Sequence, residues 1–153
     1  MKNATFEVEV SQEDALRFAE LSGDWNPLHT DPEHAAKTMY KKTVLHGAFS
    51  GGLISRMAGI FIHGIDCLLH NMRLKFVAPI IPPATLTVSA QLISESSGVG
   101  RVEASVSDKN SGVRYVEAIY DFGHHDFGDI CTKAKEKIKK NNAGTPVVLV
   151  SGG

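Results

Sequence analysis

The sequence predicts an α+β domain in which a long antiparallel sheet curls around one central, buried helix. Residues 46–62 are apolar or small on nearly every side, which is typical of a helix shielded from water. Alternating segments separated by turn residues follow it, and such segments favour antiparallel strands joined by short turns. At 153 residues, the chain has the length of one compact domain.

The elements before the central helix are predicted from local signals. Residues 5–10 alternate between apolar and charged side chains, as in a half-buried strand. Ser11 has the pattern of a helix N-cap, and Ser22-Gly23 marks the end of that helix. A polar loop is expected over 23–30, because Pro27 keeps Asn26 out of the α region. Next, Asp31 followed by Pro32 predicts a short helix.

Small residues recur at every fourth position of the central helix: Gly47, Gly51, Ser55 and Gly59. Each glycine costs a helix about 1 kcal/mol relative to alanine. We therefore expect another backbone to approach the helix closely along this ridge. The strands that follow are predicted near 68–77, 86–92, 102–106 and 116–122.

The C-terminal part of the sequence has a different character. Residues 1–123 are predicted to form the folded domain, and the lysine-rich residues 124–145 a charged linker. In residues 146–153 an apolar run precedes Ser-Gly-Gly, which is how a dinucleotide-binding βαβ unit begins. We expect this segment to be the start of a truncated, Rossmann-type reductase domain.

Composition excludes several classes of function. The formal charge of −1 provides no basic excess for nucleic acid, and polar residues interrupt the longest apolar stretch, so no membrane span is expected. Cys67 and Cys131 are too few for a disulfide framework or a cysteine-rich zinc site. With no apolar signal segment at the N-terminus, a cytoplasmic protein is expected.

Two neighbouring segments carry groups suited to chemistry. Asp24 and His29 flank a bend fixed by Asn26-Pro27, and a carboxylate with an imidazole can share a water for acid–base catalysis. His46-Gly47 opens the central helix, whose free N–H groups suit a developing oxyanion. Ser55 lies two turns further on and is equally well explained as a binding hydroxyl or as a packing residue.

The segment 21–29, with its S-G-D-x-N-P-x-H pattern, and Val44-Leu45-His46-Gly47 resemble the MaoC-like, (R)-specific enoyl-CoA hydratase family. The resemblance covers about residues 6–122. It implies a hot-dog fold, usually in a homodimer or larger assembly, and reversible syn addition of water to trans-2-enoyl thioesters. Its catalytic pair falls on Asp24 and His29, its oxyanion amide on Gly47, its motif asparagine on Asn26 and a serine near the substrate on Ser55.

The same resemblance implies acyl-CoA or acyl carrier protein thioesters as substrates and no further cofactor. Relatives of this kind are sometimes joined to a short-chain reductase. Asn26 and His46 are expected to support the site.

Three other interpretations remain. A hot-dog thioesterase usually needs a carboxylate on or beside the central helix, but the sequence has none between Glu33 and Asp66. A non-catalytic acyl-thioester-binding module would not need the Asp24/His29 pair. A metal site at His124-His125-Asp126 is disfavoured because the cluster is predicted to lie in a surface loop. His34, His63 and His70 are expected to be surface or packed residues.

Overall fold

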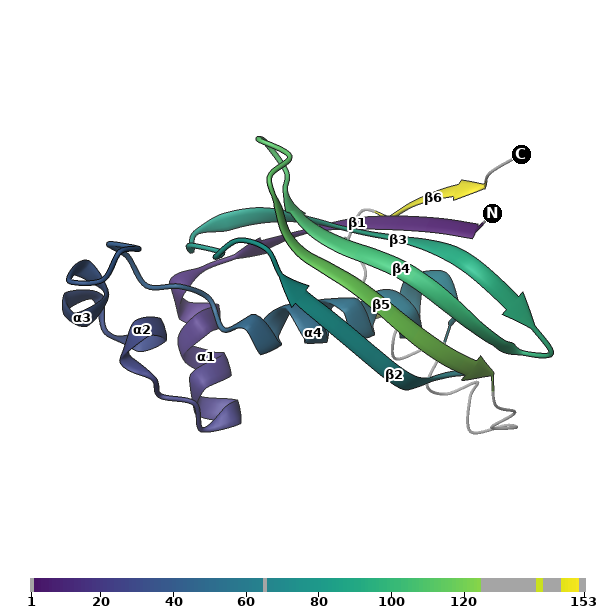
Figure 1. The fold of residues 1–153 in the computed structure, drawn as a ribbon, viewed down its shortest axis with the longest axis horizontal. Helices are drawn as coiled ribbons and strands as arrows, with labels where there is room; N and C mark the ends of the chain where they lie inside the picture. The colour runs from purple at the N-terminus through teal and green to yellow at the C-terminus, as the bar shows by residue number, and fades with distance from the viewer. Residues whose placement is uncertain (1, 65, 125–139, 142–146, 152–153) are drawn as a thin grey trace.

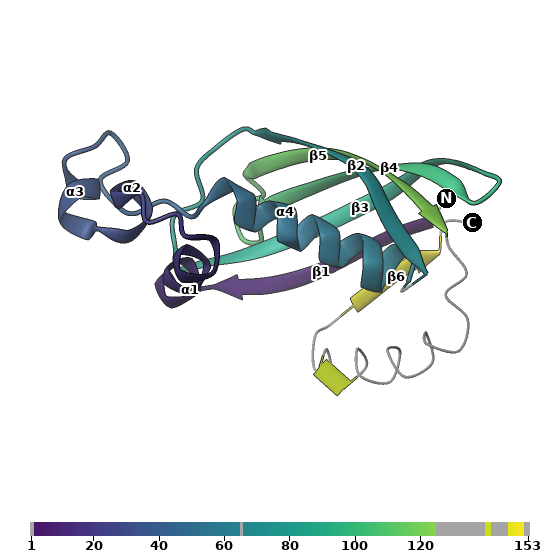
Figure 2. The ribbon, with the colours of Figure 1, turned by 90° about the horizontal axis from the view of Figure 1, so that it is seen from below.

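In the computed structural model, a six-stranded antiparallel sheet wraps one side of a central helix, which confirms the predicted α+β architecture (Figures 1 and 2). The structure describes residues 2–64, 66–124, 140–141 and 147–151. The elements are β1 (Lys2–Val10), α1 (Gln12–Ser22), α2 (Pro27–Thr30), α3 (Pro32–Ala36), α4 (Gly47–Arg56), the π-helix η1 (Met57–Ile62), β2 (Cys67–Phe76), β3 (Ala84–Ser96), β4 (Val99–Asp108), β5 (Arg114–His124) and β6 (Val147–Ser151).

A transverse row of alanines lies across the middle of the sheet. Ala4 pairs with Ala90, Ala90 with Ala104, and Ala104 with Ala118, so the row crosses β1, β3, β4 and β5. All four are buried and belong to the same core cluster as the central helix. Because alanine side chains are short, the helix can lie close to the sheet at this row.

The central helix differs from the prediction in two ways. It is α-helical only over Gly47–Arg56, and residues Met57–Ile62 continue it with π-helical geometry. It is also not buried on every side, since Ala48, Gly52 and Ser55 are exposed in the single chain. Periodicity missed this exposed face because its residues are small rather than charged.

The small-residue ridge is contacted by side chains of β2 rather than by a backbone. A Cβ atom on Gly47 would lie 2.9 Å from the ring of Phe76, and one on Gly51 would lie 3.3 Å from Leu74. Ser55 is exposed, and a Cβ atom on Gly59 would meet nothing within 4 Å. The expected close approach of a backbone is therefore wrong, and only the first half of the ridge is packed.

The N-terminal elements follow their local signals, with one exception. Ser11 and Asp14 form a reciprocal capping box at the start of α1, and Gly23 ends the helix in the left-handed conformation. The expected loop over 23–30 is wrong for Pro27–Thr30, which forms α2. Asn26 and Pro27 occupy the N-cap and N1 positions of α2, the same signal that predicted α3.

The C-terminal strand β6 pairs antiparallel with β1, from Lys2 opposite Ser151 to Phe6 opposite Val147. It therefore extends the main sheet at the β1 edge (Figure 1). A βαβ unit needs parallel pairing, and its remaining parts would lie beyond Gly153, so the reductase domain stays a prediction. Most of the predicted linker, 124–145, lies outside the described residues, as do His125 and Asp126 of the proposed metal cluster.

Candidate active site

Three elements bring Asp24, His29 and His46 together at one end of the sheet. Asp24 lies in the loop after α1, His29 in α2, and His46 immediately before α4; these elements lie side by side in Figure 2. One ligand-type atom from each of the three side chains lies within 4.8 Å of the other two. The pair separated by five residues in the sequence therefore does converge, next to the first turn of the central helix.

The backbone around Asp24 is held by short-range hydrogen bonds. Its N–H donates to Ser22 Oγ at 3.2 Å, and its Oδ1 accepts from the Asn26 N–H at 3.2 Å. The side chain remains 53% exposed. Asp24 is thus a carboxylate on a tight turn with oxygen atoms still open to water.

His29 is fixed by its Nδ1 atom. This atom lies 2.6 Å from the carbonyl oxygen of Val44. Since a carbonyl can only accept, Nδ1 carries the hydrogen, which leaves the lone pair of a neutral ring on Nε2. Asn26 supports the same element, because its side chain accepts from the Leu28 N–H at 2.9 Å and so caps α2.

Gln12 links α1 to both sides of this arrangement. Its amide donates to the His29 carbonyl oxygen at 3.2 Å, while its Oε1 accepts from Thr43 Oγ1 at 2.6 Å. No pattern in the sequence predicts this role, because Gln12 lies in the first turn of a helix far from the motif. Its contacts tie α2 to the segment that leads into α4.

Gly47 provides the first N–H of α4, and the N–H groups of a first helical turn have no partners inside the helix. The nearby Phe76 ring gives a packing reason for glycine at this position, in addition to open access for a ligand. Ser55 is exposed on α4, two turns further on. Ser50 has a buried hydroxyl in the first turns of α4. This hydroxyl has no hydrogen-bond partner in the described part of the chain.

The other histidines in the described part of the chain lie apart from this site. His63 stacks on Phe122 with ring centroids 3.5 Å apart, and His124 Nε2 lies 3.5 Å from Glu95. His34 and His70 are exposed. Asp24, His29 and His46 are close enough to hold a metal ion, but one ring nitrogen of each histidine already contacts a backbone carbonyl.

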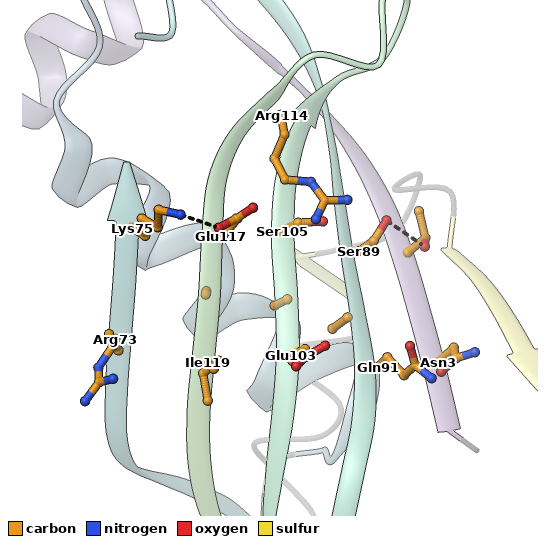
Figure 3. Close-up of a pocket in the computed structure, with 14 residues that line it drawn as sticks. Asn3, Arg73, Lys75, Ser89, Gln91, Glu103, Ser105, Arg114, Glu117 and Ile119 are labelled. Atoms are coloured by element: carbon orange, nitrogen blue, oxygen red, sulfur yellow. Dashed lines mark hydrogen bonds and ion pairs between the residues drawn. The ribbon is translucent and has the colours of Figure 1, made fainter. Parts of the chain in front are cut away.

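A hollow of about 700 Å³ lies on the outer face of the sheet (Figure 3). Polar and charged side chains line it, including the ion pair of Lys75 with Glu117 at 3.2 Å. None of its lining residues belongs to the Asp24 cluster. The Asp24 cluster, rather than this hollow, therefore remains the candidate for acid–base chemistry.

The fold and this site define a hot-dog protein of the hydratase and dehydratase class. The chain belongs to the family described as the MaoC like domain, whose sequence model matches residues 2–113. It is 31% identical over 112 residues to an (R)-specific enoyl-CoA hydratase of Rhodospirillum rubrum, covering 71% of this chain and 78% of the relative. It is 36% identical over 72 residues to a 3-hydroxybutyryl-CoA dehydratase of Methylorubrum extorquens, but that match covers only 47% of this chain and 46% of the relative.

Solved structures support the same fold. An R-hydratase from Pseudomonas aeruginosa matches with a TM-score of 0.76 and 22% identity, over 99% of this chain and 85% of that one. The (R)-hydratase from A. caviae has the same TM-score and identity, over 80% of this chain and 93% of that one. At this identity the likeness is evidence for the hot-dog fold alone.

Proposed function

We propose that the protein catalyses reversible, (R)-specific addition of water to trans-2-enoyl thioesters. The observation that carries this proposal is the convergence of Asp24 and His29 beside the first turn of α4. The Asp24 carboxyl, the Nε2 side of the His29 ring and an N–H of the first turn of α4 are the three groups that this reaction needs.

In the hydration direction, Asp24 and His29 hold one water between them. One of the two groups removes a proton from the water as its oxygen bonds to C3. The thioester carbonyl takes up the displaced electron pair as an enolate, and the Gly47 N–H stabilises the negative oxygen. The other group enters the step carrying one proton, as the Asp24 carboxylic acid or as the His29 imidazolium with hydrogen on Nε2, and donates it to C2 on the same face, which completes syn addition. A proton passed between the two groups then restores the starting state. Dehydration follows the same steps in reverse.

The carrier end of the substrate is anionic, and exposed lysines lie on the segment between α3 and α4. Lys37, Lys41 and Lys42 are exposed and form no ion pair among the described residues. Lys42 precedes the buried Thr43 and Val44, and Val44 holds His29. We propose that these lysines bind the phosphate groups of coenzyme A or of a carrier protein's phosphopantetheine arm.

We also propose that the chain assembles as a homodimer through the free edge of β2. This strand is the last in the sheet order, and Met72, Phe76 and Val77 at this edge are partly exposed. A second copy would cover this edge and continue the sheet. Light scattering should give twice the mass of one chain, and a monomer at assay concentration contradicts this proposal.

A thioesterase is the nearest alternative, and a single assay separates the two reactions. With crotonyl-CoA, a hydratase consumes the enoyl absorbance and forms (R)-3-hydroxybutyryl-CoA, identified with an (R)-specific dehydrogenase. A thioesterase instead releases free thiol. A non-catalytic binding module does neither. Hydration without thiol release is the expected result; thiol release or no turnover contradicts the proposal.

We further propose that residues 1–123 form the hydratase domain, that it works without a cofactor of its own, and that it acts in the cytoplasm. Among the described residues, no helix is long and apolar enough to cross a bilayer. We also keep the proposal that residues 146–153 begin a reductase domain. The open reading frame downstream of Gly153 tests it, and a stop codon directly after Gly153 would contradict it.

A further inference from the structure

We propose that His46 is a positioning residue that fixes Asp24 and His29 relative to one another, through a hydrogen bond to the first and ring stacking on the second. The consequence for catalysis rests on the proposed function, in which Asp24 and His29 share the reacting water. The contacts themselves can be tested without any assay of activity.

The hydrogen bond holds the backbone of Asp24. His46 Nε2 lies 2.9 Å from the Asp24 carbonyl oxygen, whereas its distance to Asp24 Oδ2 is 4.0 Å. Because the carbonyl can only accept, Nε2 carries the hydrogen. The bond therefore anchors the turn and leaves the Asp24 carboxylate available to water.

The surroundings of the other ring nitrogen of His46, Nδ1, favour one tautomer. His46 Nδ1 is buried and has no hydrogen-bond partner among the described residues. A buried N–H without an acceptor is more costly than a bare lone pair on a ring that is already satisfied at its other nitrogen. His46 is therefore assigned as the ring with hydrogen on Nε2 and none on Nδ1.

The ring face of His46 packs on His29. The two ring centroids are 4.0 Å apart with an interplanar angle of 31°. The hydrogen bond to Val44 holds the edge of the His29 ring, and the His46 ring packs against its face. Phe18 contacts His46 with centroids 5.1 Å apart, and His46 is only 2% exposed, so its own position is set by the core.

The catalytic residues need such an anchor because their own elements are weak. Asp24 lies on an exposed turn, and α2 has only four residues, too few for a helix that is stable by itself. His46 lies at the start of α4, which packs in the core. A displacement of about 1 Å in a catalytic group can cost on the order of 10²-fold in rate.

Two variants separate the hydrogen bond from the ring. His46→Gln keeps an N–H donor of similar reach and loses the ring, while His46→Phe keeps a ring and loses the donor. We expect His46→Phe to lower kcat by about 10-fold or more and His46→Gln to recover part of that loss. KM should stay within about twofold, because His46 is not placed against the substrate. The exposed His34→Gln serves as the control and should match wild type.

Wild-type kcat in His46→Phe, or an equal loss in both folded variants, would overturn the proposal. So would a loss that appears only in KM. Nuclear magnetic resonance of the wild-type protein provides the second readout and needs no variant to fold. Nitrogen shifts should show His46 protonated at Nε2 alone, and the His29 ring protons should be shifted upfield by the His46 ring.

Absence of that spectroscopic signature refutes the inference whatever the activity. His46→Gln should remove the upfield shift of His29, and His46→Phe should keep it. A wild-type protein that shows the signature but hydrates no enoyl thioester overturns the proposed function, and with it the catalytic consequence of these contacts. The two failures are therefore distinguishable.

Discussion

The Nδ1 atom of His29 donates a hydrogen bond to the carbonyl oxygen of Val44 at 2.6 Å, across fifteen positions of the sequence. This bond leaves Nε2 as the nitrogen of His29 that would act on water in the proposed mechanism. It also links α2 to the segment that enters α4, so that Asp24, His29 and His46 are held in one arrangement.

We expect Asp24→Asn and His29→Gln each to lower kcat for enoyl-CoA hydration by about 10²-fold or more, the scale of acid–base groups. Both variants keep the size of the side chain but lose the proton transfer. Asp31→Asn is the matched control, because asparagine caps a helix as well as aspartate does. Near wild-type turnover by either variant would remove that residue from the mechanism.

Gly47→Ala should lower kcat with a modest loss of stability. The new Cβ atom would lie 2.9 Å from the Phe76 ring, so either the ring or the first turn of α4 must move. Gly52→Ala is the control, since a Cβ atom there meets nothing within 4 Å. That variant should gain up to about 1 kcal/mol in the free energy of unfolding. Urea unfolding and steady-state rates measure both effects, and an unchanged kcat in Gly47→Ala argues against the oxyanion role.

Replacing Lys41 and Lys42 together by glutamate should raise KM for a CoA thioester about 10-fold, because charge-assisted contacts to phosphate are lost and repulsion replaces them. The effect should weaken as ionic strength rises. The control substrate is the N-acetylcysteamine thioester, which has no phosphate and should react as well with the variant as with wild type. Equal losses on both substrates would show that the lysines do not bind the carrier.

His63 should make the fold less stable in acid. Burial, followed by the charges of Lys2 and His124, lowers the pKa of His63 from 6.5 to about 3. Between these two pKa values the unfolded chain therefore binds more protons than the folded chain. The contribution of His63 to the free energy of unfolding is fully present above pH 6.5 and is lost as the pH falls toward 3. Urea midpoints at pH 7.5 and pH 5 measure this loss. His63→Phe should reduce the difference between the two midpoints, and an unchanged difference contradicts the assignment.

Removal of metal should leave the reaction unchanged. Asp24, His29 and His46 could hold an ion, but the proposed mechanism uses none. Dialysis against a chelator followed by the crotonyl-CoA assay should return the starting rate. A loss of rate restored by a divalent cation would require a different mechanism.

Local signals in the sequence determined the elements of this fold. Alternation predicted strands near their observed positions, and Ser11, Gly23 and Asp31 marked helix ends, because caps and periodicity depend on neighbouring residues. The same kind of signal at Asn26-Pro27 marks the start of α2, which the expected loop over 23–30 does not include.

The pair Asp24 and His29 could also be predicted from the sequence, since both lie on one short bend whose motif resembles a known family. Only the tertiary structure decided what holds them. Val44, Gln12 and His46 reach the bend through contacts between segments distant in the sequence, and no periodicity encodes such contacts. The packing of Phe76 against Gly47 and the pairing of β6 with β1 are non-local in the same way, because each depends on how the sheet closes over the helix.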